Sequence, residues 1–254
     1  DRYHSRNIEA SNIPLRNAVG FDPFSYYRRE TEEVQNFGAS NVPRVIADIS
    51  SVDTVEWRDL KSVGHFYLPE LDKWKMNDLG ADYLYVGENP IPFMVPNGLK
   101  QILNYKAWLK HSDKEHCFRI IDSNESITES NELSQQVNFL RHDAETLQLP
   151  DLVLGNHANW VIVLHTSHEL SMTALRRFFF NLKEQNIKIP VVINRQYEGV
   201  SEDQLMMFGA TDAGGLLIDG YGDGILLSTA DVFDDRKALL DSLKSCNSIA
   251  FGVL

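Results

Sequence analysis

The sequence has few cysteines. Its 254 residues include two, Cys117 and Cys246, which lie far apart and form no CxxC motif. A disulfide framework or a zinc site needs more cysteines at closer spacing, so neither follows from this sequence. Few thiols and no signal peptide predict a reducing compartment, either the cytoplasm or an organelle stroma.

Positive charge and long apolar runs are also scarce. Lys and Arg number 24 against 36 Asp and Glu, which gives a formal net charge of −12. Such a charge repels nucleic acid and anionic membranes, so we expect neither as a partner. No apolar run approaches the ~20 residues of a transmembrane helix. The hydrophobic fraction of 43% is that of a globular protein with a full core.

Motifs for nucleotide binding and acyl transfer are missing. No glycine pattern matches a P-loop or a dinucleotide-binding fingerprint between a strand and a helix. There is no GxSxG motif, and neither cysteine lies in a catalytic signature.

Short apolar runs alternate with amphipathic stretches along most of the chain. The runs predict strands at 42–49, 65–68, 82–87, 116–121, 160–165, 189–194 and 224–228. The stretches predict helices at 53–61, 69–78, 97–110, 134–147, 167–185 and 234–249. This alternation predicts parallel strands, and the length suits an α/β fold of the (β/α)8 TIM-barrel type. An open doubly wound α/β sheet is the alternative.

The position of an eighth strand is open. The candidates, 151–155 and 215–219, each lie too close to a predicted strand for a parallel crossover. We favour one helix from about 202 to 218, ending at Gly220. Residues 1–40 are polar and irregular and are predicted as a linker segment, and residues 41–254 as a single barrel domain.

Two places could carry chemistry. The loop formed by Asp219, Gly220, Gly222, Asp223 and Gly224 could hold a metal or a phosphate. Its acids would repel phosphate, however, and a turn that precedes a barrel strand lies on the N-terminal face, so a structural turn is favoured.

The second place is the predicted strand end at His165 and His168, for which Asp48 and Asp122 are candidate partners in a metal site. Nothing in the sequence shows that these side chains converge, and a capping or solvent-facing role is the favoured interpretation.

The segment 209–227, and above all the string LLIDGYGDG at 216–224, resembles 4-hydroxy-3-methylbut-2-enyl diphosphate synthase of the three-domain, plant-type form. The segment 26–32 resembles the start of the extra central domain of that form. The resemblance implies a parent oxidoreductase of the non-mevalonate route of isoprenoid biosynthesis, which opens a cyclic diphosphate with a [4Fe–4S] cluster and an electron-donor protein. It also implies that the central domain is barrel-like and positions a substrate-binding barrel and a cluster domain.

The chain departs from the catalytic parts of that family. Two distant cysteines cannot supply the cluster ligands. A diphosphate site needs several converging Arg or Lys residues. The predicted strand ends offer one basic residue, Arg195, among Asp48, Glu88, Asp122, His165 and Asn194. No catalytic, cofactor-binding or metal residue is therefore carried over, and the fragment alone is predicted to be inactive.

The function predicted from these observations is that of a structural spacer domain. Its partners would be the flanking domains of the parent chain, with the electron-donor protein as a further candidate. The start at Asp1 and the helix-like end at Leu254 favour a piece of a longer enzyme. A free-standing barrel enzyme with a metal at His165 and His168, or a protein-docking domain, are the alternatives.

Overall fold

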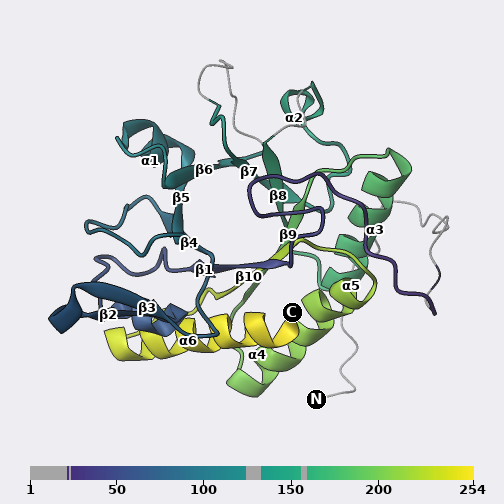
Figure 1. The fold of residues 1–254 in the computed structure, drawn as a ribbon. Helices are drawn as coiled ribbons and strands as arrows, with labels where there is room; N and C mark the ends of the chain where they lie inside the picture. Colours follow the sequence, from purple (N-terminus) through teal and green to yellow (C-terminus); the bar gives the residue numbers. More distant parts are fainter. Residues whose placement is uncertain (1–21, 23, 124–132, 156–158) are drawn as a thin grey trace.

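In the computed structural model, which describes residues 22, 24–123, 133–155 and 159–254, the chain folds into a closed barrel of parallel strands (Figure 1). The order around the barrel is β1-β10-β9-β8-β7-β6-β5-β4. The strands are β1 (Arg44–Asp48), β4 (Tyr83–Gly87), β5 (Lys100–Asn104), β6 (Cys117–Asp122), β7 (Asn138–Asp143), β8 (Trp160–His165), β9 (Val191–Tyr197) and β10 (Gly224–Thr229). The predicted (β/α)8-type barrel is confirmed, and the open-sheet alternative is wrong because β1 pairs with both β10 and β4.

The strands bury both faces, which explains their continuous apolar sequences. On β8, Val161 and Val163 belong to the cluster inside the barrel, whereas Ile162 and Leu164 pack outside it. This alternation follows from the two-residue period of a strand.

Helices cover parts of the outside. They are α1 (Tyr105–Lys110), α2 (Asp151–Gly155), α3 (Ser171–Glu184), α4 (Glu202–Gly209), α5 (Gly215–Ile218) and α6 (Arg236–Val253), with a π-helical turn η4 (Ala210–Gly214) between α4 and α5. The helices predicted at 167–185, 202–218 and 234–249 are thus confirmed as α3, α4 to α5, and α6. Ser201 and Gln204 form a capping box at the start of α4.

The region between β1 and β4 differs from the prediction. The run 65–68 is a strand, β2 (His65–Leu68), but it pairs antiparallel with β3 (Lys73–Met76) in a hairpin outside the barrel. The helix predicted at 69–78 is therefore wrong, and its start is one short 3₁₀ turn, η2 (Pro69–Leu71). The helix predicted at 53–61 is replaced by the 3₁₀ helix η1 (Asp59–Val63).

Two strands of the barrel, β5 and β7, were not predicted from the sequence, because they lie within stretches predicted as helices. The first half of 97–110 is β5, followed by the short helix α1. The stretch 134–147 is not a helix but contains β7. Neither candidate for the eighth strand is a strand, since 151–155 is α2 and 215–218 is α5.

The described residues just before β1, at 28–43, close the N-terminal end of the barrel, and this purple segment can be followed in Figure 1. Phe37 is fully buried inside this end. Its ring lies 4.9 Å from that of Tyr83 and 5.7 Å from that of Phe139, measured between ring centroids. Side chains therefore fill the barrel and close its N-terminal end. The other end, at the C-terminal ends of the strands, stays open.

Candidate functional site

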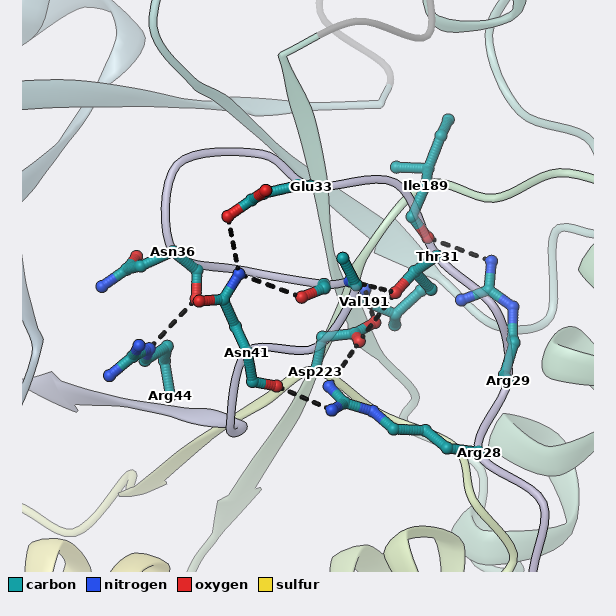
Figure 2. Close-up of polar contacts among 12 residues, drawn as sticks. Arg28, Arg29, Thr31, Glu33, Asn36, Asn41, Arg44, Ile189, Val191 and Asp223 are labelled. Atoms are coloured by element: carbon teal, nitrogen blue, oxygen red, sulfur yellow. Dashed lines mark hydrogen bonds and ion pairs between the residues drawn. The ribbon is translucent and has the colours of Figure 1, made fainter.

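A buried carboxylate, Asp223, ties the segment before β1 to the closed end of the barrel (Figure 2). Its Oδ1 accepts hydrogen bonds from Arg28 Nη2 and Thr31 Oγ1, each at 3.1 Å. Its Oδ2 accepts one from the backbone N–H of Val191 at 3.0 Å. We call Arg28, Arg29, Thr31 and Asp223 the base latch.

Arg29 extends the latch along the chain before β9. Its Nη2 donates to the carbonyl oxygens of Ile187 at 2.7 Å and Ile189 at 3.0 Å, as Figure 2 shows for Ile189. Burial lowers the pKa of Arg29 to about 10, although Asp223 and Tyr221 oppose this shift. The guanidinium stays charged at neutral pH, so these are charge-assisted hydrogen bonds.

The loop predicted from Asp219 to Gly224 lies at this closed end and carries the latch. Gly220 has φ +82°, and a Cβ there would come within 2.2 Å of the Tyr27 carbonyl oxygen. Gly222 has φ +106°, and a Cβ on Gly224 would lie 2.8 Å from the Arg44 carbonyl oxygen. Asp219 pairs with Arg176 of α3. The loop's glycines therefore allow close backbone packing, and its two acids bind arginines of this chain.

The open end holds a cavity of about 510 Å³ at the C-terminal ends of the strands. We call it the barrel mouth. It is lined by Asp48, Ser50, Tyr85, Ile120, Arg141, Val163, His165, Thr166, Ser167, Asn194, Arg195, Gln196, Leu226 and Ser228. Ligand sites of (β/α)8 barrels form at this end, because loops of variable sequence converge there.

The four residues proposed for a metal site are only partly brought together. Asp48 and His165 both line the mouth. Asp122 is instead paired with Arg141 at 3.2 Å, and His168 Nδ1 accepts a hydrogen bond from the Leu170 N–H at 3.0 Å. Within the described ranges, no group of three or more His, Cys, Asp or Glu side chains is placed to hold a metal ion.

Arg141 is a mouth residue that the sequence reasoning missed, because it lies on β7, which was predicted as a helix. The expectation of a single basic residue, Arg195, at the strand ends is therefore wrong. The Arg141 guanidinium lies 5.2 Å from the centre of the Tyr85 ring. Burial would lower the pKa of Arg141, but Tyr85, Asp122 and Asp48 together raise it.

The other charged groups of the mouth also have partners within the protein. Arg195 donates from Nε to Asp212 at 3.1 Å and from Nη1 to the Thr166 carbonyl oxygen at 2.7 Å. Burial raises the pKa of Asp48, while hydrogen bonds from Ser50 and the charge of Arg141 oppose this shift. The barrel mouth thus contains acidic and basic side chains that interact with each other, rather than a cluster of charges of one sign.

His165 lies within the fields of both arginines. Burial lowers its pKa, and Asp143 and Asp122 oppose that shift, whereas Arg141 and Arg195 add to it. A histidine with a lowered pKa is neutral at pH 7 and offers one N–H donor and one acceptor nitrogen. It can therefore share a hydrogen bond with a ligand without adding a charge.

A closed parallel barrel with a plugged base and a polar mouth defines the class of this chain: a (β/α)8-type barrel domain. Its relatives are named 4-hydroxy-3-methylbut-2-en-1-yl diphosphate synthases. The chain is 26% identical over 230 residues to the flavodoxin-type synthase of Parabacteroides distasonis. The matched region takes in 89% of this chain and 33% of the relative. For Bacteroides fragilis the identity is 26% over 242 residues, or 95% of this chain and 34% of the relative.

A plant relative matches a shorter part. The chain is 37% identical over 76 residues to the chloroplastic, ferredoxin-type synthase of Arabidopsis thaliana, which is 29% of this chain. No family model matches the sequence. The resemblance predicted from 216–224 is confirmed by these relatives, and the chain spans about a third of the length of the bacterial ones.

Proposed function

We propose that this chain is a non-catalytic spacer domain of a 4-hydroxy-3-methylbut-2-enyl diphosphate synthase. It would hold the substrate-binding barrel and the [4Fe–4S] domain of the parent enzyme at a productive distance. The observation that carries the proposal is the match itself, which takes in 89% of this chain but 33% of the P. distasonis relative. Such a match suits one domain among several.

The segment around Arg29 and the end of α6 would lead to neighbouring domains of the parent enzyme. Both lie beside helix α5. The Arg29 N–H donates to the Gly220 carbonyl oxygen at 2.8 Å, just after α5. Just before α5, a Cβ on Gly214 would lie 3.3 Å from Val253 Cγ1, near the end of α6. Gly214 and Gly220 are six residues apart, which at the rise of a helix is about 9 Å, so the incoming and outgoing segments lie close together. Neighbouring ends are what the insertion of one domain into another requires.

The cysteines of this chain do not fit a role in holding the cluster. Cys117 and Cys246 are buried in two different apolar clusters. Burial raises the pKa of each thiol to about 12, so both stay protonated at neutral pH. Cluster ligands are thiolates. The cluster and the flavodoxin or ferredoxin named in the relatives are therefore assigned to the rest of the parent enzyme.

The name of one relative supports a proposal for the cellular location. The Arabidopsis relative is chloroplastic, and we propose the cytoplasm or an organelle stroma for this chain. No helix in the described ranges is long and apolar enough to cross a membrane.

The test replaces residues 28–253 of the full-length parent enzyme by a Gly/Ser linker of about four residues, whose mean span of about 11 Å matches the gap across α5. We expect turnover of the cyclic diphosphate to be lost while the iron content and visible spectrum of the cluster are kept. Full turnover in the linker version would contradict the spacer role.

A matched control separates spacing from chemistry in the barrel. In the intact parent enzyme, Asp48→Asn removes the acidic group of the mouth residue without deleting the domain. We expect its turnover to stay within about twofold of the unmodified enzyme, because the proposed role depends on the body of the domain. A loss of turnover in this variant, with the fold intact by circular dichroism, would favour a catalytic barrel instead.

A further inference from the structure

The barrel mouth continues into a second cavity. This second lobe has a volume of about 480 Å³ and shares Asp48, Ser50, Gln196 and Ser228 with the mouth. Its far wall is the loop from β10 to α6 and the start of that helix. The apolar residues there are Ala230, Val232, Phe233, Leu239 and Leu243. Ser51, Thr229 and Asp231 also line this lobe. The two lobes form one cleft, and its apolar side chains gather at the end formed by the β10–α6 loop and helix α6.

The polar end is rich in donors. Arg141, His165 and Arg195 come from the neighbouring strands β7, β8 and β9. A guanidinium has five N–H donors, and the hydrogen bonds of Arg195 to Asp212 and Thr166 use two of them. Arg141 donates to Asp122 and also bonds to Tyr85. Both arginines therefore have N–H donors left for a ligand acceptor while they keep these protein partners.

An acceptor in the same wall points to a second feature of the ligand. Asn194 lines the mouth, and its Oδ1 is buried without a hydrogen-bond partner in the described part of the chain. A buried carbonyl oxygen left without a donor is costly, and native structures satisfy most such atoms. The Asn194 side chain as a whole is only half-buried, so a small rotation would bring this oxygen to a ligand hydroxyl, which would supply the donor.

The charges of the mouth residues limit which anionic group can bind there. The guanidiniums of Arg141 and Arg195 interact with three carboxylates, Asp122, Asp48 and Asp212. Because Asp122 and Asp212 are ion-paired with these guanidiniums, little net positive charge is left, which disfavours a diphosphate that needs several cations without such partners. A single carboxylate can still form charge-assisted hydrogen bonds with the two guanidiniums.

We propose that this cleft binds a small hydroxycarboxylate: a molecule with one carboxylate, a nearby hydroxyl and a short alkyl chain. The carboxylate lies between Arg141 and Arg195 and accepts from His165. The hydroxyl donates to Asn194 Oδ1. The alkyl chain enters the second lobe beside Val232 and Phe233. This site is separate from the spacer role, which depends on the body of the domain.

The test titrates 3-hydroxybutyrate into the 254-residue chain by calorimetry and by NMR shifts of the His165 ring. We expect saturable binding with a Kd of about 1 mM or lower. Butyrate, which lacks the hydroxyl, should bind about tenfold more weakly. Inorganic pyrophosphate should bind more weakly than 3-hydroxybutyrate.

Three variants assign the binding to the cleft. Arg195→Gln should weaken binding about tenfold or more, since it removes a charged donor. Val232→Asp changes a side chain that is 95% exposed, so the fold is kept while the second lobe gains a further acidic group beside Asp231 that repels the ligand. Arg58→Gln, an exposed arginine outside both lobes, is the matched control and should leave the Kd unchanged.

Three results would each overturn the proposal. They are the absence of saturable binding at about 10 mM ligand, tighter binding of pyrophosphate than of 3-hydroxybutyrate, and an unchanged Kd in both cleft variants.

Discussion

Asp223→Ala is expected to destabilise the chain by about 3 kcal/mol, because it removes the acceptor at the centre of the base latch. The variant leaves Arg28, the Thr31 hydroxyl and the Val191 N–H without their carboxylate partner. Breaking a buried ion pair by removing one partner costs ~3–5 kcal/mol. The Arg28 side chain is 25% exposed and so remains partly solvated, which favours the lower end of this range. Urea unfolding monitored by circular dichroism measures the change in the free energy of unfolding.

The matched control is Glu30→Gln on the same segment. Glu30 pairs with Lys188 at 3.0 Å, but its side chain is 77% exposed, so its removal should cost less than about 1 kcal/mol. Amide hydrogen exchange gives an independent readout, since Asp223→Ala should increase exchange at Phe37, whose N–H bonds to Val34. Equal stabilities of the two variants would show that the latch does not hold the segment before β1.

The parts of the fold that the sequence predicts are those in which local pattern and tertiary role agree. The run 160–165 is apolar from Trp160 to Leu164 and β-branched at 161–163, and it is strand β8. The helix α3 has one apolar face, with Leu175, Phe178 and Leu182 buried against the barrel. In both cases the periodicity of the sequence matches the burial in the structure.

The stretch 134–147 shows why the rest could not be predicted. Val137, Leu140, Ala144 and Leu147 have helical spacing, yet Leu140 lies on β7 and Ala144 and Leu147 lie after it. All four side chains belong to or pack against apolar clusters, as their hydrophobicity predicts. Their helical spacing in the sequence, however, does not reflect a helix. A short apolar run cannot be assigned to strand or helix by periodicity alone. The same error hid Arg141, because a residue on a predicted helix is not placed at a strand end.

The base latch was beyond sequence reasoning for another reason. Arg28 and Asp223 are 195 positions apart. The loop at 219–224 was expected to be a turn, but its local sequence does not contain the arginine that Asp223 binds. Contacts of such separation come from barrel closure, which brings β1 next to β10. They follow from the topology once it is known.

Replacement of Arg119 by Met is expected to stabilise the protein by about 1–4 kcal/mol. Arg119 is fully buried on β6, and none of its three side-chain nitrogens has a hydrogen-bond partner in the part of the chain that the structure describes. Burial lowers its pKa to about 10, so it is still charged at neutral pH. The loss of hydration is offset in part by the rings of Tyr105 and Trp108, whose centres lie 5.7 and 5.1 Å from the guanidinium carbon.

Met fills a similar volume against these rings and needs no partner, since a thioether makes favourable contacts with aromatic edges. Thermal unfolding of Arg119→Met should show a midpoint higher by about 2–4 °C for each kcal/mol gained. Arg58→Met is the control, because Arg58 lies 4.5 Å above the Trp57 ring but is exposed. Its loss should cost no more than about 1 kcal/mol. A fall in the midpoint of Arg119→Met would mean that the buried guanidinium is stabilised by more than its two rings, and that its charge contributes to the fold.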